Sequence, residues 1–251
     1  MGKDRAANRG KRMAKLGFIY PIGGGEYEYY QFAESLDYRV KPYLVFAWHA
    51  GGDENHDPDA LKETGAVDRL AVSARGLVPL DPDVVLWACT SGSFIAGRAW
   101  AEDQVKGIAA VTGKPTSSTS IAFVNAAHHL GAKRVAVLAS YPERTSKAFG
   151  SFLQEHGIGV SHLQWMDAPG GRDAYLMPLE RFMKAAREAD GPDVDAFLVP
   201  DTAIAGFPLI GPLERELGKP VLTANQVTIW EALRLAGWRE KVAGYGKLLA
   251  A

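Results

Sequence analysis

The chain has 251 residues, which is enough for one large α/β domain or two small ones. Its residues are 47% hydrophobic and 23% charged, as in an ordinary soluble enzyme, and a formal net charge of −1 gives no electrostatic footprint for nucleic acid. The single cysteine excludes an internal disulfide, and no Cys/His spacing typical of structural zinc is present.

The first thirteen residues form a basic segment that we interpret as a solvated tail. The stretch MGKDRAANRGKRMAK is rich in Lys and Arg, and no apolar signal core follows it. No apolar run approaches the ~18 residues that a transmembrane helix needs. We therefore expect a cytoplasmic protein that binds neither nucleic acid nor a membrane.

Apolar runs of strand length alternate with helical patterns along the rest of the chain. The expected strands are Leu16–Tyr20, Tyr43–Trp48, Val84–Ala88, Gly107–Val111, Arg134–Ala139, Gly159–Leu163, Ala196–Val199 and Val221–Thr223. The expected helices are Glu26–Leu36, Asp59–Gly76, Phe94–Val105, Ser120–Leu130, Glu143–His156, Leu176–Ala189, Pro208–Leu217 and Thr228–Ala236. This alternation predicts an α/β fold with parallel sheets and helices on both faces.

Three short segments recur in the same order in the two halves of the chain. DVVLWACT at Asp83–Thr90 matches DAFLVPDT at Asp195–Thr202, AKLGFIYP resembles AKRVAVLASYP, and GKPTSST resembles GKPVLTA. We interpret the three matches as a duplication. Ligands bind beyond the carboxyl ends of parallel strands, so two such halves facing each other would bring Cys89 and Asp201 to one cleft.

Cys89 follows a buried strand and precedes Thr90, Ser91 and Ser93. A lone thiol here is either a small buried hydrophobe or a nucleophile or proton carrier. The start of the following helix would favour the thiolate, and the hydroxyls could cap that helix or hydrogen-bond an anionic ligand. Both alternatives remain open for the hydroxyls.

Asp201 and Tyr141 also have two interpretations each. Asp201 either caps the next turn or acts as an acid or base opposite Cys89, and its charge would tend to keep Cys89 protonated, so that the two titrate together. Tyr141, in SYPE, either packs in the core or donates its hydroxyl to a carboxylate in the cleft.

Two loops have weaker signals. The glycines of YPIGGGEYEYY either bring backbone N–H groups close to an anion or form a flexible turn, and the loop lacks the pattern of a nucleotide site. HAGGDENHD at His49–Asp57 matches no standard metal site, and we interpret it as a mobile flap over the cleft.

These motifs resemble the aspartate/glutamate racemase superfamily, in its arylmalonate decarboxylase and maleate isomerase branch. The resemblance runs from LGFIYPIGGG through ACTSGSF, GAKRVAVLASYPE and LVPDTA to GKPVLTANQVTIWEALRLAG. It implies two pseudo-symmetric α/β lobes with the active site between them, and neither a metal nor an organic cofactor. We expect residues 14–118 with 225–251 to form the lobe of Cys89, and residues 119–224 the lobe of Asp201.

The resemblance also implies roles for particular residues. The family's racemases and isomerases use one cysteine from each lobe, whereas the decarboxylase keeps only the second-lobe cysteine, as proton donor. This chain departs from both patterns, because Cys89 occupies the first-lobe position and Asp201 the second. The expected substrate-binding residues are hydroxyls and loop glycines, namely Thr90, Ser91, Tyr141, Gly24, Gly25 and Thr202.

We therefore expect a cofactor-independent enzyme that acts at the carbon next to a carboxylate. The first hypothesis is an arylmalonate-decarboxylase-like enzyme with Cys89 as proton donor. The alternatives are a maleate-type cis–trans isomerase with Cys89 as nucleophile, a racemase or epimerase that uses Cys89 and Asp201, and a non-catalytic carboxylate-binding protein. The expected partner is a small mono- or dicarboxylate, and a homo-oligomer is compatible with the sequence.

Overall fold

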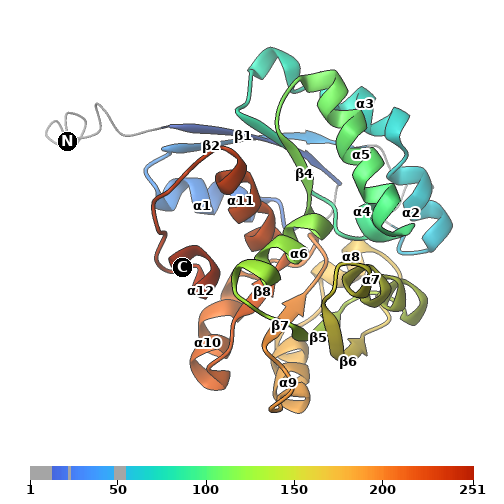
Figure 1. Cartoon of the computed structure of the whole chain (residues 1–251), viewed down its shortest axis with the longest axis vertical. Helices are drawn as coiled ribbons and strands as arrows, with labels where there is room; N and C mark the ends of the chain where they lie inside the picture. Colours follow the sequence, from blue (N-terminus) through green and yellow to red (C-terminus); the bar gives the residue numbers. More distant parts are fainter. Residues whose placement is uncertain (1–12, 22–23, 48–54) are drawn as a thin grey trace, which may run out of the picture.

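Two parallel sheets of four strands form the framework of the molecule. The computed structural model describes residues 13–21, 24–47 and 55–251 (Figure 1). The first sheet has the order β2 (Val40–Phe46), β1 (Ala14–Tyr20), β3 (Val84–Trp87), β4 (Thr116–Ser118). The second has the order β6 (Gly159–Trp165), β5 (Arg134–Ala139), β7 (Ala196–Val199), β8 (Val221–Thr223). The expected fold class is confirmed.

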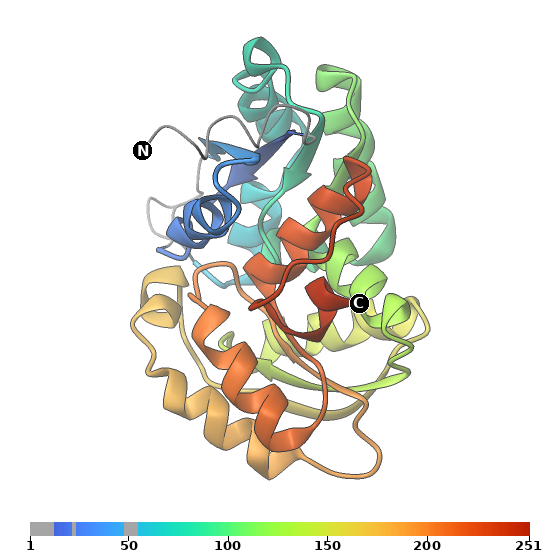
Figure 2. The ribbon, with the colours of Figure 1, turned by 90° about the vertical axis from the view of Figure 1, so that its left-hand side faces the viewer.

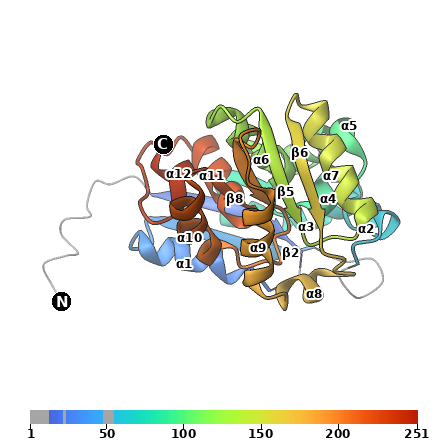
Figure 3. The ribbon, with the colours of Figure 1, turned by 90° about the horizontal axis from the view of Figure 1, so that it is seen from below.

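Helices cover the faces of the two sheets. They are α1 (Tyr27–Ser35), α2 (Pro58–Thr64), α3 (Val67–Arg75), α4 (Ser91–Phe94), α5 (Gly97–Thr112), α6 (Thr119–His129), α7 (Glu143–Glu155), α8 (Gly171–Tyr175), α9 (Leu179–Ala189), α10 (Phe207–Leu217), α11 (Ala224–Leu235) and α12 (Gly246–Ala250). A 3-10 turn covers Val78–Leu80. Seen from below, α9 and α10 lie on the outer side of the second sheet (Figure 3).

The repeated segments occupy equivalent strands in the two sheets. The aspartate before β3, Asp83, accepts the backbone N–H of Lys15 at 2.8 Å, and the aspartate before β7, Asp195, accepts that of Arg134 at 2.8 Å. Each aspartate thus joins the start of its strand to the neighbouring strand. The same local hydrogen bond therefore explains why an Asp recurs at this position in both lobes.

The expected strand at Gly107–Val111 is wrong, because these residues lie inside α5. A short apolar run cannot be assigned by periodicity alone, and here the helix continues to Gly113, which ends it at a φ of 66°. The fourth strand of the sheet is Thr116–Ser118 instead. It has only three residues, all polar, so it gives no apolar signal.

Several expected helices are divided. The helix expected at Asp59–Gly76 breaks into α2 and α3 at Gly65, where a Cβ would lie 2.6 Å from the carbonyl oxygen of Gly92. The helix expected at Phe94–Val105 is the single turn α4 followed by α5. The helix expected at Leu176–Ala189 begins at Leu179, after Pro178, and α8 precedes it.

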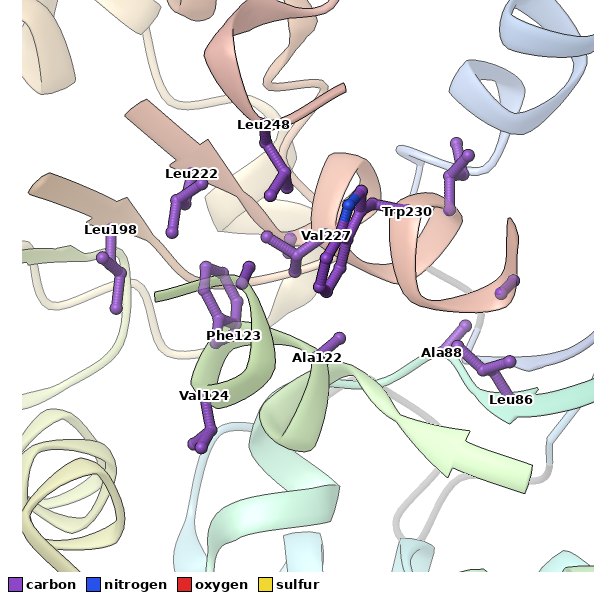
Figure 4. Packing of buried hydrophobic residues seen from close by; sticks show 14 of the residues in the cluster. Leu86, Ala88, Ala122, Phe123, Val124, Leu198, Leu222, Val227, Trp230 and Leu248 are labelled. Carbon is purple, nitrogen blue, oxygen red and sulfur yellow. The ribbon is translucent and has the colours of Figure 1, made fainter. Parts of the chain in front are cut away.

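A buried apolar cluster joins the two lobes. Figure 4 shows Phe123 of α6 among Leu198, Leu222 and Val227, which come from β7, β8 and α11, and the same cluster contains Leu86 of β3. Two further clusters lie on the outer sides of the sheets. The central cluster therefore holds the two sheets at a fixed distance.

The C-terminal segment contacts both lobes. Helix α11 packs against β1, β3 and β4 of the first sheet and against α6, and it runs along the upper lobe in Figure 2. Helix α12 instead packs against α10 and β8. The chain after β8 therefore ties the second lobe to the first.

A buried carboxylate also connects the lobes. Glu28 of α1 is 1% exposed, and it accepts the backbone N–H of Phe207 at 2.6 Å and the Nδ2–H of Asn225 at 2.8 Å. Asn225 in turn donates to the carbonyl oxygens of Gly25 and Thr202. Burial raises the pKa of Glu28 to about 7, and the donated hydrogen bonds oppose that rise.

We predict that Phe123→Ala lowers the free energy of unfolding by about 3–5 kcal/mol, because it leaves a cavity in the cluster between the lobes. Denaturant unfolding followed by circular dichroism would measure the change. Phe46→Ala is the matched control, because Phe46 is 55% exposed. A loss for Phe123→Ala no larger than for this control would contradict the assigned core.

We predict that Glu28 destabilises the protein as the pH rises from about 4.5 to about 7. Its pKa is raised in the folded state, so the unfolded chain releases this proton first, and stability falls through this window and is constant above it. Relative to Glu28→Gln, which does not titrate, the wild type should lose roughly 3 kcal/mol. Urea unfolding at several pH values tests this. Glu34→Gln, at an exposed position of α1, is the control that should keep the pH dependence of the wild type, because it retains Glu28.

Candidate active site

Cys89 and Asp201 line one cavity between the lobes. Cys89 lies two residues beyond the end of β3, and Asp201 lies two residues beyond the end of β7. The described residues that line the cavity are Tyr20, Pro21, Asn55, His56, Leu61, Thr64, Cys89, Ser91, Gly171, Asp201, Thr202 and Ala203. Equivalent strand ends thus place a thiol and a carboxylate in the same space.

The Cys89 thiol is buried and receives a backbone hydrogen bond. The N–H of Gly92 points at Sγ at 3.3 Å, and the hydroxyl of Ser91 lies 3.9 Å from Sγ. The carbonyl of Gly92, which belongs to the next peptide group, accepts hydrogen bonds from Trp100 and Gln104 and so helps to hold Gly92 in place. An N–H directed at sulfur stabilises negative charge there, as a proton donor requires after it has given up its proton.

The hydroxyls beside Cys89 do not cap the helix that follows them. Thr90 is the N-cap residue of α4, but its side chain makes no capping hydrogen bond. Its hydroxyl instead accepts the backbone N–H of Asp201 at 3.3 Å, which leaves its own proton available to donate. The hydroxyl of Ser93 bonds back to the carbonyls of Cys89 and Thr90. The capping interpretation of these hydroxyls is therefore wrong.

Asp201 is a buried carboxylate in a strained backbone conformation. It is 5% exposed and has a φ of 100°, a region that residues other than glycine rarely adopt and that costs about 1–3 kcal/mol. The hydroxyl of Ser140 donates to Oδ2 at 2.6 Å, and the N–H of Ala203 donates to Oδ1 at 3.0 Å. The hydrogen bond from Ala203, two residues later, is the local turn contact expected of a capping Asp. Asp201 therefore caps the turn that follows it, and its other oxygen bonds to Ser140.

Burial raises the pKa of Asp201, while His56 and the hydroxyl of Ser140 oppose the rise. His56 Nε2 lies 3.6 Å from Oδ2 of Asp201, and both side chains are almost fully buried. Sequence analysis placed His56 in a flap and gave neither it nor Ser140 a role. A histidine in a polar loop has no periodic signal, and only the packing of the lobes brings it to Asp201.

Tyr141 lies behind the cavity lining. Its side chain is fully buried, with the ring edge-on to His56 at 4.8 Å and to Phe94 at 5.8 Å. Its hydroxyl forms no well-shaped hydrogen bond with the described residues, although the nearby hydroxyls of Thr90 and Ser91 lower its pKa. Burial outweighs them and raises that pKa well above its usual value. This phenol is a buried donor beside the hydroxyls of the cavity.

The remaining expected site residues lie at the lobe contact. Gly25 allows close approach, because a Cβ there would lie 2.2 Å from the carbonyl oxygen of Thr202. Gly24 has a φ of 111°, and its N–H donates to Glu26 rather than into the cavity. Thr202 lines the cavity, and its carbonyl accepts from the hydroxyl of Tyr20 at 2.6 Å.

Part of the loop at His49–Asp57 falls outside the described residues, namely positions 49–54. Residues 1–12 of the basic tail also lie outside them. In the described part of the chain, no group of three or more acidic, His or Cys side chains is placed to hold a metal ion. None of the described helices is long and apolar enough to cross a membrane.

Comparison with known proteins identifies relatives that span most of this chain. An arylmalonate decarboxylase from Bordetella bronchiseptica is 28% identical over 215 residues, covering 84% of this chain and 88% of that protein. A maleate isomerase from Nocardia farcinica is 28% identical over 216 residues, covering 83% and 85%. A solved cysteine-to-serine variant of Nocardia farcinica maleate cis–trans isomerase, with a covalently bound succinylcysteine intermediate, superposes with a TM-score of 0.85 at 22% identity, over 95% of this chain and 98% of that chain.

The family model described as arylmalonate decarboxylase matches residues 55–249, which include Cys89, Tyr141 and Asp201. That span is well over half of the chain. The relatives that it resembles are enzymes, a decarboxylase and isomerases. The chain therefore belongs to the arylmalonate decarboxylase family.

Proposed function

We propose that this protein is a cofactor-independent decarboxylase of a substituted malonate, with Cys89 as the proton donor. The observation that carries the proposal is the content of the cavity, where Cys89, the chain's single thiol, faces Asp201 rather than a second cysteine. Loss of CO2 followed by protonation needs only one proton delivered to carbon, and one thiol is sufficient for that step.

The hydroxyls beside the thiol supply the binding site for the carboxylate that remains. Ser91 lines the cavity, Thr90 has a hydroxyl proton available, and the Tyr141 phenol lies behind them. When the bond between the central carbon and the departing carboxylate breaks, its electron pair forms an enediolate on the remaining carboxylate. Donors that are already oriented stabilise this developing charge without reorganisation.

Cys89 then gives its S–H proton to the central carbon, and the enediolate becomes a carboxylate. The thiolate left behind is stabilised by the N–H of Gly92 and regains a proton from solvent before the next turnover. The balance is one C–C bond broken, one C–H bond formed and one CO2 released.

The activity is tested by proton NMR in D2O with a panel of arylmalonates and alkylmalonates. We expect loss of the malonate signal and a product that carries deuterium at the central carbon. Absence of decarboxylation across the whole panel would count heavily against the proposal.

We predict that Cys89→Ala abolishes turnover, with a loss of at least ~10²-fold, while the fold remains intact. The sulfur is small, so its removal should cost about 1–2 kcal/mol of stability, below typical large-to-small core losses. Cys89→Ser should be nearly as inactive, because a hydroxyl is a far weaker acid. Kinetics beside thermal melts measure both effects, and a folded Cys89→Ala variant that keeps more than about a tenth of the rate contradicts the assignment.

A second candidate is a maleate-type isomerase with Cys89 as the nucleophile. A maleate isomerase matches this chain at the same 28% identity as the decarboxylase, and a neighbouring isomerase structure holds a succinylcysteine adduct. In this reaction Cys89 would add to the double bond, the new single bond would rotate, and elimination would release the trans acid.

We predict that Asp201→Asn separates the two candidates. An isomerase should lose activity severely, at least ~10²-fold, because addition and elimination need a second proton carrier. A decarboxylase should lose less. Conversion of maleate to fumarate, with mass spectrometry for an adduct on Cys89, gives the direct comparison, and a wild type inert toward maleate removes the second candidate.

A further inference from the structure

The second lobe holds the His56 ring, although His56 precedes α2 of the first lobe. Nδ1 lies 2.9 Å from the carbonyl oxygen of Ala168, and the backbone N–H donates to Pro169 at 2.9 Å. The hydroxyl of Thr145 donates to the backbone carbonyl of His56 at 2.7 Å, and the ring packs edge-on against Tyr141. These contacts fix both the place and the rotation of the imidazole.

The carbonyl of Ala168 determines which ring nitrogen carries a proton. A carbonyl oxygen only accepts, so Nδ1 is the protonated nitrogen and donates to it. In the neutral ring Nε2 then has a lone pair, which lies 3.6 Å from Oδ2 of Asp201. A lone pair facing an ionised carboxylate is repelled, so the favoured states have a proton on Nε2 or on Oδ2.

A pair that holds one such proton has no net charge. An imidazolium beside a carboxylate and an imidazole beside a carboxylic acid both sum to zero. The other titratable groups around Asp201 in the described structure are Cys89 and Tyr20, which line the same cavity, and Tyr141, packed on His56. None of the three can bear a positive charge, so His56 is the group among these that can neutralise Asp201.

We propose that His56 is a positioning residue that keeps the Asp201–His56 pair in this neutral, one-proton state, and so admits a carboxylate ligand beside a buried aspartate. The inference rests on the proposed function for the ligand class, since a malonate brings two negative charges into the cavity. Like charges repel strongly where water is excluded. An ionised Asp201 without its partner would therefore weaken ligand binding.

The first experiment is NMR and needs no turnover. In the wild type, 15N spectra of the ring should show a proton on Nδ1 of His56 at every pH. A neutral ring protonated at Nε2 alone overturns the proposal. This measurement uses the unmodified protein, so it decides even if variants at this position fail to fold.

The second experiment follows the 13C signal of the Asp201 carboxyl with pH. In His56→Gln the pKa of Asp201 should rise above its wild-type value, because the cationic ring that opposes burial is gone. His156→Gln is the matched control, since His156 also has Nδ1 2.8 Å from a carbonyl, that of Phe152, but does not line the cavity. An unchanged Asp201 titration in His56→Gln overturns the proposal.

The third experiment measures phenylmalonate binding by calorimetry in a Cys89→Ala background, in which the proposed function expects no turnover. The pH is one at which Asp201 is ionised when His56→Gln is added, whereas the intact Asp201–His56 pair still holds its proton. His56→Gln should weaken binding at least about tenfold, and adding Asp201→Asn should restore it, because no charge then needs neutralising. Weakened binding that Asp201→Asn does not restore overturns the proposal. If the ligand binds tightly and the NMR results are as expected, but the protein that retains Cys89 decarboxylates no malonate, the proposed function is refuted and this inference stands.

Discussion

The buried carboxylate of Asp201 is the constraint on which the geometry of the site depends. A carboxylate removed from water needs donors around it. The structure provides the hydroxyl of Ser140, the N–H of Ala203 and the ring of His56. These come from the end of β5, from the loop of Asp201 itself and from the segment before α2. The two hydrogen bonds arise within the lobe of Asp201, and the contact with His56 depends on the packing of the two lobes.

The same backbone position in the other lobe holds a different chemistry. Cys89 needs little polar support, and it receives a directed N–H from Gly92, whose carbonyl accepts from Trp100 and Gln104. A repeated fold thus presents unlike groups to one cavity, a thiol on one side and a carboxylate coupled to an imidazole on the other. The two sides of the cavity therefore differ in chemistry although their backbones are equivalent.

Packing between the lobes fixes the distance between those two sides. Phe123 lies in a cluster with residues of both sheets, and Glu28 with Asn225 connects α1 to the loop of Thr202 and to the start of α10. The apolar cluster supplies the stability, while the Glu28 network sets the approach of the loops. Both belong to the lobe contact rather than to either sheet alone.

The sequence by itself determined the α/β class, the two-lobe plan and the placement of Cys89 and Asp201 at one cavity. These followed from local features, because buried strands are apolar and the repeated Asp and Gly-Lys-Pro segments mark the starts of equivalent strands. It did not determine β4, whose three polar residues pair only because β3 lies beside them. It also gave no role to Ser140, Glu28 or His56. Their partners are far away in the chain. The pairing of β5 with β7 brings Ser140 to Asp201, and only the packing of one lobe against the other brings Glu28 and His56 to their partners.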